Sequence, residues 1–282
     1  MTTVAIIGVG ELGATVSQSI ALRDCVQRVV IIDDAASAAT GVALDIQQSG
    51  PVERFHTTLT GTDDLSAVTG TAVCVVADRA GGESREWSGD EGLAMIQRLL
   101  QYSPSAPIVF AGTQQVALMQ HAARELRAPR ERLIGSAAEA LASAIRSIVA
   151  LEAQCSTADV ALSVLGTPPD GFVVPWNDAS IGGYALERTL SQAQIARLEA
   201  RSARLWPPGP FTLATAAARI VEAIVGVGRN SLAALTPLDG EFGVRNQVAA
   251  LPVFLAQHGI ARVRVPELNT RERVRLETVL KG

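Results

Sequence analysis

A glycine-rich motif near the N-terminus has the spacing that phosphate binding requires. Gly8, Gly10 and Gly13 follow a β-branched apolar run, and Glu11 and Leu12 lie between the second and third glycines. The first two glycines let the backbone turn and approach a pyrophosphate, and the third lets a helix pack closely on a strand. Because a helix N-terminus attracts anions, the motif predicts a pyrophosphate site made by these five residues.

An acidic residue lies where a ribose-binding carboxylate is expected. Asp33 follows the apolar segment 28–32 and stands 20 residues after Gly13. A carboxylate at that place accepts hydrogen bonds from the adenosine ribose hydroxyls and repels the extra phosphate of NADP. The pattern therefore predicts a dinucleotide ligand, NAD in preference to NADP. The alternative is that the glycines serve only the geometry of the chain.

The elements that must position this motif alternate along the first half of the chain. Short β-branched runs predict strands, and longer segments with helical periodicity predict helices between them. Strands are expected at 3–9, 28–32, 56–60, 72–77 and 108–111, and helices at 35–48, 90–102 and 115–127. This alternation favours an α/β fold with a doubly wound parallel sheet.

The second half has a different pattern. A long alanine-rich helix is expected at 136–154 and a second long helix at 211–227, with a further helix at the C-terminus. The expected strands at 158–165, 172–174, 231–238, 248–254 and 261–265 do not alternate regularly with helices. We therefore expect two domains, a nucleotide-binding domain at 1–134 and a mixed α+β substrate-type domain at 135–282.

Composition limits the class of partner. The 282 residues are 48% hydrophobic and 18% charged, with a formal net charge of −4, which favours a folded globular protein. A nucleic-acid or anionic membrane surface needs a cationic face, so neither partner is expected. The three cysteines lie far apart and no zinc-like spacing occurs, so no metal is expected. No secretion signal or long apolar run is present, and a cytoplasmic location is expected.

Several segments outside the glycine motif resemble the lactate and malate dehydrogenase family. They are GVALDIQQSGP at 41–51, VLG at 164–166 followed by FVVPW at 172–176, and LDGEFGVRNQVAALPVFLAQHGIARV at 238–263. The resemblance covers nearly the whole chain. It implies a Rossmann-type half, a mixed α+β half, a substrate between them beside the nicotinamide, and a homodimer or homotetramer.

The family's mobile loop carries two arginines six residues apart, and this chain has arginines at the same spacing. Arg79 and Arg85 lie in ADRAGGESR, without the family's proline before the first arginine. An arginine there polarises a substrate carbonyl or clamps a carboxylate. By resemblance the two residues are candidate contacts for a small anionic substrate. The alternative is two solvated arginines in an arginine-rich chain.

The resemblance fails at the family's catalytic positions. The asparagine-proline-valine-aspartate turn is replaced by a turn that begins at Gln114, which remains a candidate ligand of the nicotinamide ribose. Ala142 and Ile145 stand where the family has an aspartate and a substrate-binding arginine. Pro168 stands where the catalytic histidine is expected. Since these three groups move the proton, orient the imidazole and bind the carboxylate, the usual dehydrogenation is expected to be absent or very slow.

Two readings of function remain open. In the first, the protein binds NAD(H) without the usual hydride transfer and acts as a sensor, scaffold or subunit partner. In the second, it is an oxidoreductase for a different, anionic carbonyl or hydroxyl substrate. Asp170 and Glu139 would then be the candidate substitute acids. A purely structural use of the fold is less favoured, because the glycines and Asp33 would then have no reason to occur together.

Overall fold

The computed structural model describes residues 2–81, 85–226 and 231–281. The first half contains strands β1 (Thr3–Ile7), β2 (Arg28–Ile32), β3 (Thr58–Thr62), β4 (Val73–Val76), β7 (Ile108–Phe110) and β8 (Leu133–Gly135). Between them lie helices α1 (Glu11–Arg23), α2 (Ala36–Glu53), α3 (Gly89–Tyr102) and α4 (Val116–Arg124). Apart from the edge strand β3, these strands are almost wholly apolar and buried, as parallel strands covered on both faces must be.

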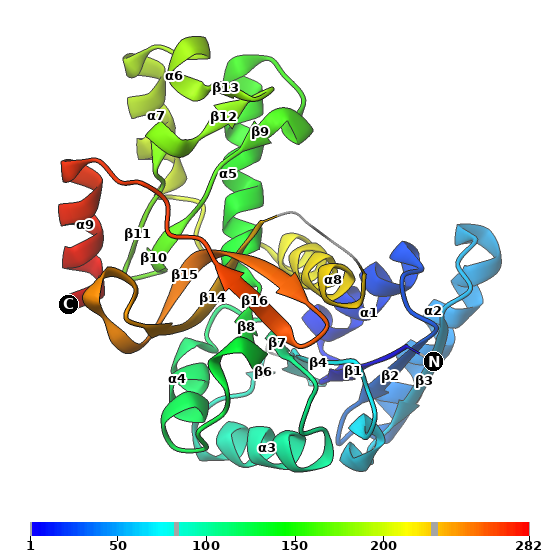
Figure 1. Cartoon of the computed structure of the whole chain (residues 1–282). Coiled ribbons are helices and arrows are strands. Elements are labelled where there is room, and N and C mark those ends of the chain that lie inside the picture. The colour runs from blue at the N-terminus through cyan, green and yellow to red at the C-terminus, as the bar shows by residue number, and fades with distance from the viewer. Residues whose placement is uncertain (1, 82–84, 227–230, 282) are drawn as a thin grey trace.

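The parallel strands are ordered β3-β2-β1-β4-β7-β8, which is the doubly wound order with a reversal between β1 and β4. Figure 1 shows α1 and α8 (Pro210–Val225) on one side of these strands and α3 and α4 on the other. This confirms the predicted fold class. It also places the turns that follow β1 and β4 side by side, because carboxyl ends of parallel strands meet at one edge of a sheet.

Strands of the second half extend the same sheet instead of forming a separate one. β14 (Leu232–Asp239) pairs antiparallel with β8 through Leu235 and Gly135, and β15 (Arg245–Ala256) pairs with β14. Next to β15 come β10 (Leu165–Thr167), β11 (Gly171–Val173) and β16 (Gly259–Val263). The expected domain boundary between residues 134 and 135 thus falls within β8. We propose that it separates a nucleotide-binding part from a substrate-binding part within one continuous sheet.

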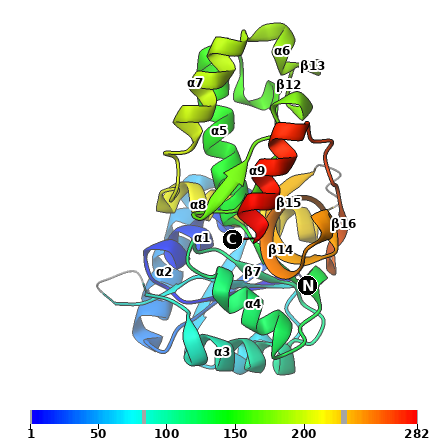
Figure 2. The same ribbon diagram turned by 90° about the vertical axis from the view of Figure 1, so that its left-hand side faces the viewer.

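A separate lobe stands beyond the sheet. It holds α6 (Leu186–Thr189), α7 (Gln192–Ser202) and a small sheet of β9 (Val160–Ala161), β12 (Ser180–Ile181) and β13 (Tyr184–Ala185). Helix α5 (Ala137–Ala153) runs from the main sheet into this lobe, and the C-terminal helix α9 (Thr270–Lys281) packs against β10 and β11. Figure 2 shows the lobe at the opposite end of the molecule from α2 and α3.

Some sequence-based boundaries are wrong. The segment 158–165 was expected as one strand, but β9 pairs with β12 and β10 pairs with β15, so the chain crosses from one sheet to another between them. β8 was not predicted, because three apolar residues next to a long helix give no periodicity. The third strand begins at Thr58, not at residue 56, because Asp24 binds the backbone of His56 and Thr57.

Candidate functional site

The glycine turn lies at the point where the strand order reverses. Gly8 has a φ of 102°, and its N–H donates to Ile32 O at 2.8 Å. A Cβ on Gly13 would lie 2.1 Å from Gly8 O, so only glycine allows α1 to pack this closely on the turn. Both glycines therefore have the roles in chain geometry that the motif predicts.

The N-terminus of α1 is bonded to a carboxylate of the protein. Asp78 follows β4 and is 2% exposed. Its carboxylate accepts from Gly13 N at 2.8 Å and from Leu12 N at 3.3 Å, and its carbonyl accepts from Gly10 N at 2.8 Å. A Cβ on Gly10 would lie 2.4 Å from Asp78 Oδ2. The space left by the second glycine is thus filled by Asp78, while Glu11 is exposed on the first turn of α1.

Asp33 is also bonded within the chain. It is 6% exposed, and its Oδ2 accepts from Val9 N and Ala80 N, both at 2.9 Å. Its Oδ1 accepts from Ala35 N at 3.0 Å, just before α2 begins. A space of about 220 Å³ remains beside Asp33, lined in part by Asp34 and Trp87. Asp33 therefore ties the glycine turn to the segment after β4.

A second carboxylate binds the turn between β7 and α4. Glu86 accepts from Thr113 N at 3.0 Å and from Gln114 N at 2.9 Å, and a Cβ on Gly112 would lie 1.9 Å from its Oε2. Burial raises the pKa of the Glu86 carboxyl above its ordinary value, and the nearby Asp78 raises the pKa further, whereas the backbone donors oppose both. Gln114 thus meets Glu86 through its backbone, and its side chain is exposed.

The loop arginine that the structure describes faces α3. Asp78 and Arg79 form β5, which pairs with β6 (Arg85–Glu86). The Arg79 guanidinium binds Glu91 Oε1 at 2.5 Å and lies 4.6 Å from the centre of the Trp87 ring. Arg79 therefore has protein partners in place of the predicted substrate. The backbone of Arg85 pairs with that of Arg79, and the predicted role of the Arg85 side chain lies outside what the structure describes.

The turn that carries Pro168 faces the β7–α4 turn across an open cleft of about 1040 Å³. Pro168 is buried in its wall, and Asp170 is exposed at its rim. Among the described residues that line the cleft, Asp170 is the one with an ionisable side chain. The others are Thr113, Gln114, Val116, Ala117, Gln120, Thr167, Pro168, Pro169, Trp206, Pro207, Gln247, Thr278 and Val279.

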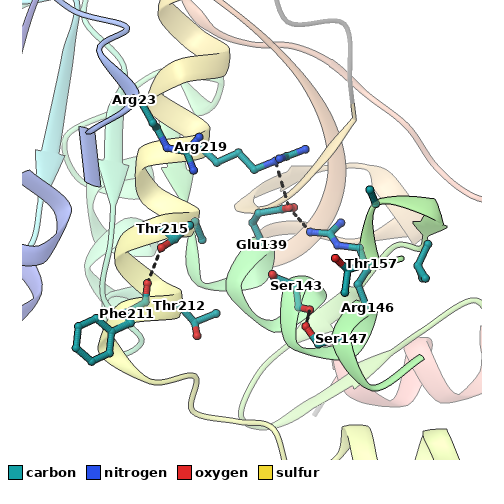
Figure 3. A pocket seen from close by; sticks show the side chains of 13 residues that line it. Arg23, Glu139, Ser143, Arg146, Ser147, Thr157, Phe211, Thr212, Thr215 and Arg219 are labelled. Carbon is teal, nitrogen blue, oxygen red and sulfur yellow. Dashed lines mark hydrogen bonds and ion pairs between the residues drawn. The ribbon is translucent and has the colours of Figure 1, made fainter. Parts of the chain in front are cut away.

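Glu139, the other candidate substitute acid, lies in a different cavity from Pro168. Figure 3 shows Glu139 on α5, between Arg146 of the same helix and Arg219 of α8. The cavity that these residues line has a volume of about 630 Å³. Glu139 is 1% exposed, forms an ion pair with Arg146, and accepts from Ala233 N at 2.8 Å. The carboxylate therefore fixes α5 to β14 and does not line the cleft at Pro168.

The two positions that the resemblance matches to the family's aspartate and arginine are closed to solvent. Ala142 and Ile145 are both fully buried on α5. A charged side chain at either position would lose its water, which is costly unless a partner and hydrogen bonds compensate it. These positions offer neither an acid nor a carboxylate clamp.

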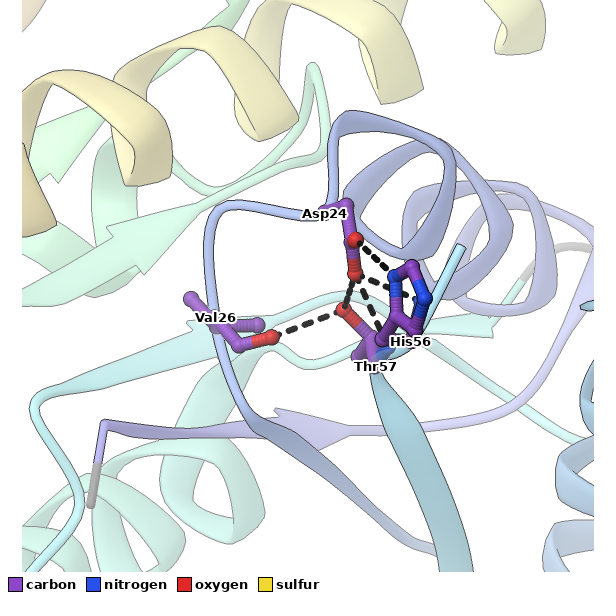
Figure 4. Close-up of polar contacts among 4 residues, drawn as sticks. All are labelled: Asp24, Val26, His56 and Thr57. Carbon is purple, nitrogen blue, oxygen red and sulfur yellow. Dashed lines mark hydrogen bonds and ion pairs between the residues drawn. The ribbon is translucent and has the colours of Figure 1, made fainter. Parts of the chain in front are cut away.

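No histidine lines the described walls of the cleft. His56 bonds Asp24 at the end of α1, as Figure 4 shows, and the same carboxylate accepts from Thr57. His121 pairs with the exposed Glu125 on α4. His258 lies in the turn between β15 and β16. None of the three therefore offers an imidazole to the cleft at Pro168.

Sequence reasoning missed Asp78 and Glu86. A usable signal existed for Asp78, because an acidic residue directly follows the buried run VCVVA, and that strand end lies beside the glycine turn in a doubly wound sheet. Glu86 gave no such signal, since its contact with the turn after β7 depends on the path of the β5–β6 hairpin. Nor did the sequence show that the glycine turn and Asp33 have partners within the chain.

The strand order and the glycine turn define a Rossmann-type dinucleotide-binding fold. Residues 2–87 match the family model described as lactate/malate dehydrogenase, NAD binding domain. The malate dehydrogenase of Dehalococcoides mccartyi is 30% identical over 98% of this chain and 95% of its own. That of Thioalkalivibrio sulfidiphilus is 29% identical over 100% of this chain and 97% of its own. The chain belongs to the lactate/malate dehydrogenase family.

Solved structures agree with this assignment. The malate dehydrogenase of Salinibacter ruber superimposes with a TM-score of 0.85 at 26% identity, covering 99% of this chain and 94% of that one. The lactate dehydrogenase of Cryptosporidium parvum shares the fold, with a TM-score of 0.89 at 20% identity and coverage of 99% and 95%. Among the described residues, no helix is long and apolar enough to cross a membrane, and no cluster of acidic, cysteine and histidine side chains could hold a metal ion.

Proposed function

We propose that this protein is an NAD(H)-binding member of the lactate/malate dehydrogenase family that does not carry out the family's usual hydride transfer. The observation that carries the proposal is the chemistry of the cleft at Pro168, whose described lining is neutral apart from Asp170. Oxidation of a 2-hydroxy acid needs a base for the hydroxyl proton and a cation for the carboxylate. Pro168, Ala142 and Ile145 can provide neither.

The nucleotide part of the proposal is supported by the match of residues 2–87 to an NAD-binding family model and by the strand order. NAD is proposed over NADP because Asp33 and Asp34 lie where the extra phosphate of NADP would be repelled. The protein would then serve as a sensor, scaffold or subunit partner in the cytoplasm. Exposed apolar side chains on α2 and α8, such as Leu44, Val52 and Phe211, are consistent with a homodimer or homotetramer.

The alternative is an oxidoreductase with another anionic substrate, and it has less support. Arg79 is bonded to Glu91, and Glu139 lies in another cavity, so Asp170 is the one predicted substitute acid at the cleft among the described residues. An exposed carboxyl alone offers no binding of an anion. We therefore favour the non-catalytic proposal.

The test is a titration with NADH and NADPH, followed by addition of oxaloacetate, pyruvate and larger 2-oxo acids. We expect NADH to raise the thermal midpoint more than NADPH, and NADH oxidation to be slower by about 10⁴-fold or more than with the Dehalococcoides mccartyi malate dehydrogenase assayed alongside. Turnover within about tenfold of that enzyme would exclude the proposal.

A further inference from the structure

The arrangement described here does not fit a bound dinucleotide. A pyrophosphate at the glycine turn would accept hydrogen bonds from the N-terminus of α1. Those N–H groups already donate to Asp78, whose carboxylate lies against Gly10 where a phosphate would approach. Two anions cannot occupy the same donors.

We propose that Asp78 and Glu86 act as internal anions that keep the nucleotide groove closed, so that NAD(H) binds only when these carboxylates leave it. This inference rests on the proposed function, because it describes how that site is controlled. Asp78 occupies the pyrophosphate donors after β1. Glu86 occupies the turn after β7, where Thr113 N and Gln114 N donate to it.

Electrostatic repulsion opposes dinucleotide binding in this groove, as the lack of space does. A dinucleotide would bring phosphate charges next to Asp78, which is 2% exposed. Like charges in a partly dry groove repel strongly, and the neighbouring Arg79 forms its ion pair with Glu91 and not with Asp78. The remaining space beside Asp33, about 220 Å³, is below the volume of about 300 Å³ at which small-molecule pockets usually begin.

The closed arrangement also leaves polar atoms without partners. Among the described residues, Arg79 Nε and Trp87 Nε1 are buried and have no hydrogen-bond partner. Arg79 directly follows Asp78, and Trp87 directly follows Glu86. Since an unpaired buried donor costs free energy, the packing of these two side chains is not optimal, and a ligand that displaces the carboxylates does not oppose a fully satisfied structure.

The test compares NADH affinity in the whole protein with that of Asp78→Ala, Asp78→Asn and Glu86→Gln, followed by nucleotide fluorescence. Glu187→Gln is the matched control, because Glu187 is exposed on α6 in the distal lobe and loses one charge in the same way. We expect Asp78→Ala to bind NADH at least about tenfold more tightly than the unaltered protein, Glu86→Gln to bind it more tightly by a smaller factor, and the control to be unchanged. Asp78→Asn replaces Asp78→Ala if the latter does not fold.

A second readout needs no nucleotide. The amide proton of Gly13 should shift between the unaltered protein and Asp78→Asn in NMR spectra, because a bond to a carboxylate is replaced by a weaker one. Equal and tight NADH binding by the unaltered protein and Asp78→Ala would overturn this inference and leave the proposed function standing. If neither the unaltered protein nor Asp78→Ala binds NADH, the proposed function fails. The Gly13 amide then decides the inference separately. An unshifted amide would reject Asp78 as an internal anion, and a shifted amide would support its place at the N-terminus of α1.

Discussion

The partners of a carboxylate decide whether it binds a ligand or holds the chain together. Asp33 occurs at the position of a ribose ligand, yet its oxygens accept from three backbone N–H groups. Asp78 has no counterpart in the sequence motif, yet it meets the helix N-terminus that the motif prepares. The residue type was readable in both cases, but the partner was not, because the donors come from segments far away in the chain.

The carboxylate of Asp24 also binds within the chain, and its contribution to stability depends on pH. His56 binds its carboxylate through side chain and backbone, Thr57 adds two further hydrogen bonds, and together they lower the pKa of Asp24 from 3.8 to about 2. A lowered folded-state pKa stabilises the protein above pH 3.8, and this stabilisation is lost as the pH falls toward 2. We expect Asp24→Asn to lower the free energy of unfolding at pH 7.

The measurement is chemical unfolding of both proteins between pH 7 and pH 2. The difference between them should be constant above pH 3.8 and should shrink below it, where the unaltered carboxyl begins to take up a proton. Asp63, which is also an exposed aspartate, provides the control Asp63→Asn. A difference that persists unchanged at pH 2 would show that the charge of Asp24 is not responsible.

At the scale of the element, helix α1 depends on glycine for its position and on Asp78 for its first N–H groups. Gly13 lets the helix begin directly over the Gly8 carbonyl, and its N–H then points to the Asp78 carboxylate. The helix has no side-chain cap at Gly10, so Asp78 takes that part from the end of β4. The geometry that suits a phosphate suits an internal carboxylate equally well.

Two glycines in neighbouring helices give a matched pair of substitutions. Gly13→Ala should destabilise the protein by at least about 2 kcal/mol, because its Cβ would lie 2.1 Å from a backbone oxygen that cannot move freely. Gly41→Ala in α2 should stabilise it by about 0.5 to 1 kcal/mol, since nothing lies within 4 Å and alanine has the higher helix propensity. Denaturant unfolding measures both, and equal effects would refute the packing argument.

At the scale of the whole molecule, one sheet joins both halves. β14 continues the sheet from β8, and α8, from the second half, packs on α1 and on β4 and β7 of the first. The second half of the chain therefore covers one face of the first half. The glycine turn and the cleft at Pro168 are therefore built on the same sheet. The N–H groups at the glycine turn bind Asp78, whereas the cleft is open.

This continuity predicts that the two halves unfold together. We expect one cooperative thermal transition, with equal calorimetric and van't Hoff enthalpies at a fixed protein concentration. The reason is that the two halves share one sheet and that α8 of the second half covers strands of the first. Differential scanning calorimetry measures both enthalpies. Two separated transitions would show that residues 1–134 and 135–282 are independent folding units.

The sequence by itself determined the doubly wound sheet, the glycine turn and the identities of Pro168, Ala142 and Ile145. Such features depend on local periodicity and on residue identity, which the order of amino acids contains directly. The tertiary structure alone decided that Glu86 meets the turn after β7 and that Glu139 belongs to another cavity. Those contacts join residues up to 94 positions apart, as between Glu139 and Ala233, and no local pattern specifies them.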